Sequence, residues 1–122
     1  MKKVLMKTPA LNMEIELNET DTADALFMAL PVESQVNVWG KEIYFEVDLE
    51  QELENPREIM EVGEVAYWPQ GRAFCLFFGP TPVSQDDRPR AVGEVTPIGR
   101  VLGDPADLDG IGDRSPVTLT RA

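Results

Sequence analysis

Apolar and polar residues alternate along most of the chain, which is the pattern of β-strands with one buried face. The clearest run covers residues 11–17, where every second residue is apolar and Asn12, Glu14 and Glu16 occupy the positions between. Similar runs cover residues 4–6, 35–39, 42–49, 65–78, 92–102 and 117–120. In the run over 42–49, Ile43 and Phe45 should face the interior, and Tyr44 and Glu46 the exterior.

The spacing changes after residue 18 and predicts a helix near residues 22–30. Ala23, Leu26, Phe27 and Leu30 recur at helical intervals, and Pro31 ends the pattern. A short helix is marginally stable alone, so its apolar stripe should enter the core and cover one end of the sheet. A second, short helical turn is expected after Asp104, which can act as its N-cap.

The segment 63–82 predicts a β-hairpin that carries five of the aromatic side chains. Its turn is Pro-Gln-Gly-Arg at 69–72, and Phe74 and Leu76 should enter the core. Cys75 lies on the opposite face and is expected to be a packed thiol. A last strand that pairs with the first would remove the exposed sheet edges. We therefore predict a mainly β protein: one closed barrel domain over residues 1–122, with one or two short helices.

The charge balance limits the partners. Eleven basic and twenty-two acidic residues give a formal net charge of -11, which opposes binding to nucleic acid and to anionic membranes. No signal-length or bilayer-length apolar run occurs, and a single cysteine cannot form an internal disulfide. We expect a cytoplasmic protein, and the sequence leaves a homo-oligomer as an alternative to a monomer.

The chain has no histidine, which excludes Ser-His-Asp triads, Cys-His nucleophiles and histidine-ligated zinc. The groups that remain available for catalysis are carboxylates, a thiol and an oxygen-ligated cation. Four aspartates between residues 104 and 113 suggest calcium, but their register does not fit an EF-hand loop, so capping and turn formation are favoured. The outward pair Glu46 and Asp48 is typical of the wet side of a strand. No metal or cofactor is expected.

The order of these segments resembles that of the small prokaryotic cyclophilin-like proteins of unassigned function. The resemblance rests on the strand WGKEIYFEV, the hairpin GEVAYWPQGRAFCLFFGPTP and the strand PIGRV, and it covers most of the chain. It implies a cyclophilin-like β-barrel. Related barrels occur in subunits that act on small amides or carboxylates, so the resemblance also allows a small-molecule pocket on the outer barrel surface.

The chain departs from true peptidyl-prolyl isomerases at two functional positions. Those enzymes carry an arginine on a Phe-His-Arg strand that assists rotation about the prolyl bond. The corresponding strand here is IYFEV, which has no arginine and places Glu46 near that position. The Ser-Gln-Phe-Phe segment of the isomerases corresponds to RAFCLFF, which lacks the glutamine.

The favoured interpretation is a binding module with a shallow small-molecule or peptide site on the barrel exterior, beside the central hairpin. The residues predicted to line it are Tyr44, Glu46, Tyr67, Arg72 and Cys75. Aromatic faces would supply contact area, and Arg72 could pair with a small carboxylate through its planar fork. The alternative is a peptidyl-prolyl isomerase with an atypical site.

Overall fold

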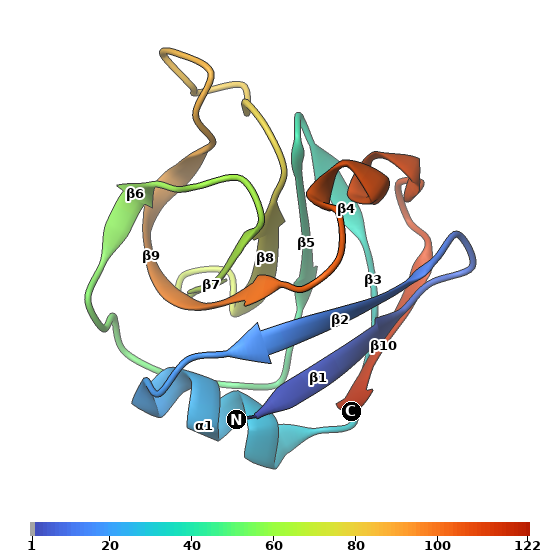
Figure 1. Ribbon diagram of the computed structural model, residues 1–122. Coiled ribbons are helices and arrows are strands. Elements are labelled where there is room, and N and C mark those ends of the chain that lie inside the picture. The colour runs from blue at the N-terminus through green and yellow to red at the C-terminus, as the bar shows by residue number, and fades with distance from the viewer. Residues whose placement is uncertain (1) are drawn as a thin grey trace.

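The computed structural model describes residues 2–122 and is mainly β, as predicted (Figure 1). Helix α1 spans Asp21–Ala29, and the 3-10 helix η1 spans Pro105–Gly110. The strands are β1 (Lys3–Lys7), β2 (Asn12–Leu17), β3 (Val32–Gln35), β4 (Asn37–Trp39), β5 (Glu42–Glu46), β6 (Arg57–Ile59), β7 (Glu64–Trp68), β8 (Ala73–Phe77), β9 (Arg90–Val101) and β10 (Pro116–Arg121).

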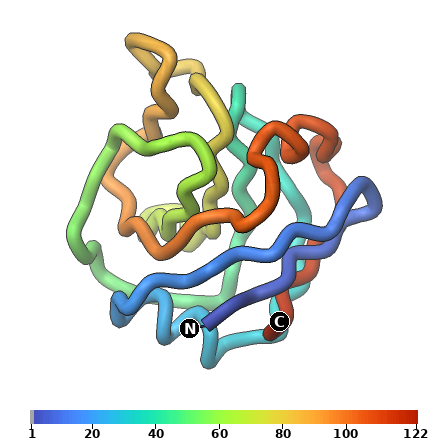
Figure 2. Tube along the Cα trace, in the orientation of Figure 1, coloured from blue at the N-terminus to red at the C-terminus, as the bar shows by residue number. Residues whose placement is uncertain are grey.

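One antiparallel sheet curls through the whole molecule in the order β3-β10-β1-β2-β9-β7-β8-β5-β4 (Figure 2). The predicted pairing of the first strand with the last is confirmed, with Val4 opposite Arg121. The two end strands, β3 and β4, follow each other in the chain and are separated by Val36. Within residues 2–122 no ladder joins β3 to β4, so the predicted closure of the barrel by hydrogen bonds is not confirmed.

Helix α1 lies across one end of the sheet, where the sequence placed it (Figure 1). The Thr20 hydroxyl caps its N-terminus by accepting a hydrogen bond from the Ala23 backbone N–H at 3.1 Å. Ala23 and Leu26 are buried in the core inside the curled sheet. The short helix is therefore held mainly by packing, as its length requires.

The interior core is built from alternate residues of the strands. On β8, Phe74 and Leu76 point inward, and the Phe74 ring stacks on that of Phe45 with centroids 5.1 Å apart. The other β8 residues, Ala73, Cys75 and Phe77, point outward but are also buried.

A second, smaller core explains the burial of the outer face of β8. The first half of β9 pairs with β6, while the second half pairs with β7 and β2. Ala91 and Val95, on the first half of β9, join Met60 and the outward residues of β7 and β8 in one apolar cluster. The ladder between β7 and β9 shifts register between Val65, opposite Gly99, and Ala66, opposite Pro97, as at a β-bulge.

Candidate functional site

A small, mostly apolar pocket lies on the outer face of the sheet, beside the second core. Its volume is about 180 Å³. Five strands, β4, β5, β7, β8 and β9, supply its lining, which consists of Trp39, Glu42, Tyr44, Trp68, Cys75, Ala91, Val92 and Val95. Tyr44 and Cys75, two of the five residues predicted to line an exterior site, meet here. We refer to this cavity as the aromatic pocket.

The pleat of β5 places an acid and an aromatic ring side by side in the aromatic pocket. Ile43 faces the interior core, so its neighbours Glu42 and Tyr44 face outward. Tyr44 lies opposite Cys75 on β8, and Glu42 lies opposite Trp39 on β4. The antiparallel ladders therefore bring together an acid, a thiol and two rings from three strands.

Aromatic rings form much of the wall. The Tyr44 and Trp68 rings meet edge to face, with centroids 6.5 Å apart and planes at 88°. Trp39 lines the same cavity, and the chain has two tryptophans in all. Intrinsic tryptophan fluorescence of this protein therefore reports on the aromatic pocket.

Glu42 is the unusual group of the pocket. The residue is only 6% exposed, and its Oε1 atom is buried without a hydrogen-bond partner. Loss of hydration on burial raises the pKa of Glu42 to about 8, and the neighbouring Cys75 thiol opposes this effect. At neutral pH the side chain is therefore mostly a protonated carboxylic acid, which can both donate and accept a hydrogen bond.

Glu64, which is buried to the same extent as Glu42, is fully partnered. Its carboxylate accepts hydrogen bonds from the Arg57 guanidinium and, at 2.8 Å, from the Glu61 backbone N–H. A buried carboxylate is stable as an ion when it has such a countercharge. Glu42 has no comparable cation in the structure, and this difference singles out the aromatic pocket.

Cys75 lines the aromatic pocket with an unreactive thiol. The thiol is buried, and its Sγ atom lies 3.8 Å from the Ala73 carbonyl oxygen. Burial, with the neighbouring Glu42 adding to it, raises the pKa of Cys75 well above its usual value. Because the thiolate is the nucleophile of cysteine chemistry, this residue is poorly suited to attack a substrate.

Tyr67 points into the interior core and not onto the outer face with Tyr44 and Cys75. The residue also lines a hollow of about 480 Å³ together with Arg72, so these two predicted residues do meet. Tyr67 is 1% exposed and packs in the interior core, and its hydroxyl donates a hydrogen bond to the Leu49 carbonyl oxygen. The reason is the register of β7: Ala66 and Trp68 face outward, so Tyr67 between them must face inward.

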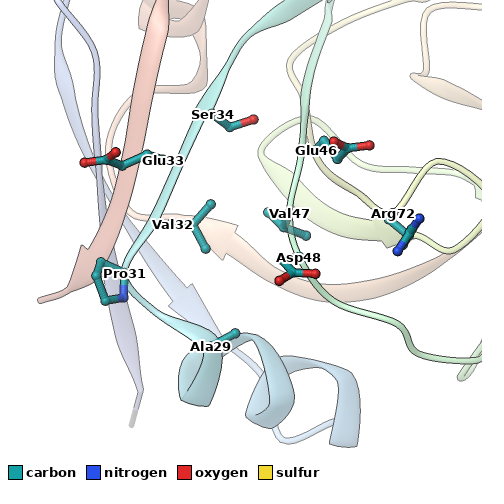
Figure 3. Close-up of a pocket in the computed structure, with 9 residues that line it drawn as sticks. All are labelled: Ala29, Pro31, Val32, Glu33, Ser34, Glu46, Val47, Asp48 and Arg72. Carbon is teal, nitrogen blue, oxygen red and sulfur yellow. The ribbon is translucent and has the colours of Figure 1, made fainter.

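Arg72 and Glu46 lie at a different hollow from Tyr44 and Cys75 (Figure 3). This hollow has a volume of about 620 Å³ and is lined by Ala29, Pro31, Val32, Glu33, Ser34, Glu46, Val47, Asp48 and Arg72. Arg72 occupies the hairpin turn with φ +47° and forms an exposed ion pair with Glu50 at 3.1 Å. Three acids line the hollow against one arginine, which disfavours an anionic ligand. The expected pairing of Arg72 with a small carboxylate stays a prediction.

The acidic segment 50–56 is docked onto the start of α1 through Glu54. The Glu54 carboxylate accepts hydrogen bonds at 3.1 Å from the backbone N–H groups of Asp21 and Thr22, at the start of α1. These bonds lower the pKa of Glu54. Glu54 thus acts as a second, long-range cap for the helix.

The aspartates between residues 104 and 113 have the structural roles that the sequence favoured. Asp104 caps η1 by accepting from the Ala106 N–H at 3.0 Å, and Asp109 pairs with Lys41 at 2.6 Å. Asp113 accepts from the Val38 N–H at 2.9 Å. Over residues 2–122, no group of three acidic or cysteine side chains is arranged to hold a metal ion.

Glu42 and both tryptophans were not among the predicted site residues. Glu42 begins the predicted strand 42–49 and is typical of an exposed strand acid until its surroundings are known. The available signal was β8, where AFCLFF is apolar without alternation, as in strands that are buried on both faces. A covered outer face would have placed the outward Glu42 in a dry environment.

Comparisons with known proteins show a family and a similar solved structure. A family model described as Cyclophilin-like matches residues 2–120. The solution structure of the hypothetical protein AF2241 from Archaeoglobus fulgidus is 38% identical in sequence, with a TM-score of 0.83. The match covers 99% of this chain and 95% of that one. No curated protein matches the chain. Among residues 2–122, no helix has the length and apolar character to cross a membrane.

Proposed function

The chain belongs to the cyclophilin-like family, and we propose that it is a binding module that takes a small ligand, or one side chain of a peptide, into the aromatic pocket. The observation that carries this proposal is the buried Glu42 carboxyl group: the residue lines the cavity, and its Oε1 atom has no hydrogen-bond partner. A buried polar atom without a hydrogen bond costs free energy, and a ligand that supplies the missing bond recovers it.

The walls of the aromatic pocket supply the remaining affinity. Aromatic and aliphatic side chains surround a single polar group, which is the usual composition of a small-molecule site. The volume of about 180 Å³ is close to that of an apolar cavity of about 150 Å³ that accommodates benzene. The ligand group that enters should therefore be about the size of one six-membered ring.

The scaffold around the pocket supports a rigid site. β3 and β4 are consecutive and joined through Val36, and we infer that the chain itself closes the barrel at this point. The pocket residues lie on strands rather than on loops, so their positions are fixed by ladders. The single, buried cysteine agrees with a reducing compartment, so we place the function in the cytoplasm.

Tryptophan fluorescence tests the proposed function directly. Small ring compounds, both neutral and charged, are titrated into the protein while emission from Trp39 and Trp68 is followed. We expect at least one class to change the emission saturably, and Glu42→Gln to alter its affinity. Glu46→Gln is the matched control, because it removes a carboxylate from the same strand face outside the pocket. A screen without any saturable response would contradict the proposal.

Peptidyl-prolyl isomerase activity is the alternative function, and we expect less than about tenfold acceleration of proline-peptide isomerisation over the uncatalysed rate. The outward side chains of β5 are Glu42, Tyr44 and Glu46, so the strand offers no arginine to stabilise charge in the transition state. Cis-trans exchange of a short proline peptide, followed by NMR, measures the acceleration. Robust turnover would promote the enzyme interpretation.

A further inference from the structure

We propose that the ligand of the aromatic pocket is a protonated amine: an ammonium group with at least one N–H directed at the Glu42 carboxyl group, and an apolar substituent that fills the cavity. The inference rests on the proposed function and names the chemical class of its ligand. Three separate observations carry it: the partners of the buried acids, the aromatic walls, and the distribution of charge.

The first observation is that Glu42 lacks the countercharge that Glu64 has. Both acids are 6% exposed, and Arg57 supplies a guanidinium to Glu64. Around Glu42, Oε1 is buried and has no partner. An ammonium ligand would supply to Glu42 what Arg57 supplies to Glu64, a cation that also donates a hydrogen bond.

The second observation is the aromatic wall. Trp39, Tyr44 and Trp68 line the cavity, and the Tyr44 and Trp68 rings stand at 88° to each other. Aromatic faces attract cations through their ring quadrupoles, most strongly for tryptophan, and such rings are used to bind ammonium ligands. Neutral apolar ligands would gain burial from these rings but no charge interaction.

The third observation concerns charge. No basic residue is among those lining the pocket. The basic residues next to it in the chain are engaged elsewhere, Lys41 with Asp109 at 2.6 Å and Arg90 with Glu58 at 3.3 Å. The net charge of -11 favours the approach of cations. A cationic ligand therefore meets no competitor and no repulsion in the pocket.

Binding of the amine should displace a proton. The neutral Glu42 acid releases its proton to solvent, and the resulting carboxylate pairs with the ammonium group. The other titratable groups that face Glu42 are the Cys75 thiol from β8 and the Tyr44 hydroxyl from its own strand, while β9 presents only Ala91, Val92 and Val95 to the cavity. Because the pKa of Glu42 is about 8, affinity should weaken about tenfold for each pH unit below that value.

Cyclohexylamine and cyclohexanol test the inference as a matched pair. Both carry one six-membered ring, and only the amine is charged between pH 6 and pH 9. Each is titrated into wild-type protein, Glu42→Gln and Glu46→Gln with tryptophan emission as the readout, and proton release is measured by calorimetry in two buffers. We expect the amine to bind at least tenfold tighter than the alcohol at pH 8, with proton release near pH 7. The wild-type protein and Glu46→Gln should show the pH dependence, and Glu42→Gln should lose it.

The outcomes separate the inference from the proposed function. If cyclohexanol binds as tightly as the amine, or if amine binding releases no proton, the amine inference is overturned and the binding function stands with a neutral ligand. If neither compound changes the tryptophan emission, the amine inference is overturned as well. The proposed function is then tested by the wider screen of small ring compounds.

Discussion

The free energy of unfolding is expected to fall by on the order of 5 kcal/mol between pH 4.5 and pH 8 through Glu42, and Glu42→Gln is expected to remove this fall. In the unfolded chain the carboxyl group has its usual pKa of 4.5, whereas in the folded protein burial raises the pKa to about 8. Between these values the folded state binds more protons than the unfolded state. Stability therefore decreases as pH rises, and the loss is complete above pH 8.

Urea denaturation of wild-type protein, Glu42→Gln and Glu46→Gln at pH 5 and pH 8.5 measures this effect. Other groups also titrate over this range, so the informative quantity is the difference between wild type and each variant at each pH. From pH 5 to pH 8.5, the free energy of unfolding of Glu42→Gln should rise strongly relative to that of the wild type. The difference between Glu46→Gln and the wild type should stay the same. A constant difference between wild type and Glu42→Gln at both pH values would mean that the acid titrates normally.

Gly99→Ala is expected to destabilise the protein by more than about 3 kcal/mol. Gly99 on β9 lies opposite Leu17 on β2, where the two strands pair over only three residues of each. A Cβ atom at position 99 would lie 2.2 Å from the Glu16 carbonyl oxygen. Since the clash is with backbone, no side-chain rotation relieves it, and the two strands would have to separate.

Gly93→Ala is the matched control for this prediction, because it makes the same change on the same strand. A Cβ atom at position 93 meets nothing within 4 Å. We expect a change in stability of less than about 1 kcal/mol, measured by the same urea titration. Equal effects of the two substitutions would show that the close approach of β2 and β9 is not what requires glycine at position 99.

Most of the barrel strands could be predicted from alternation, because one buried face imposes a period of two. This held for β2, where Met13, Ile15 and Leu17 all enter the interior core. The helix could also be predicted, because the spacing of its apolar residues and the capping side chains at its start indicate the same element. Closure of the barrel was predicted but is not confirmed, because alternation does not specify whether the end strands of a sheet pair, and no ladder joins β3 to β4 among the described residues.

The second core could not be predicted from local patterns. β6 has only three residues, which is too short for a period to appear, and it is held by pairing with a distant part of β9. That pairing places Ala91 and Val95 over β8 and makes the outer face dry. Such a contact is set by tertiary structure, so the strand residues alone carry little sign of it.

Only part of the candidate site could be predicted, because burial of the outer face is set by tertiary contacts. Strand parity correctly placed Tyr44 and Cys75 together on the outer face. Tyr67 was predicted without an assigned register for β7 and points inward, and Arg72 was predicted for its planar fork, but its turn lies at another hollow. Glu42 has the right parity, but its significance depends on burial by β9, which only the assembled fold reveals.

We infer that the aromatic pocket is built around a carboxylic acid that keeps its proton at neutral pH. Carbon-13 NMR of the glutamate side-chain carboxyl carbons, recorded from pH 3 to pH 10, measures this most directly, and Glu42→Gln assigns the resonance. We predict that the Glu42 carbon titrates near pH 8. Titration near pH 4.5 would show an ordinary hydrated carboxylate and contradict the account.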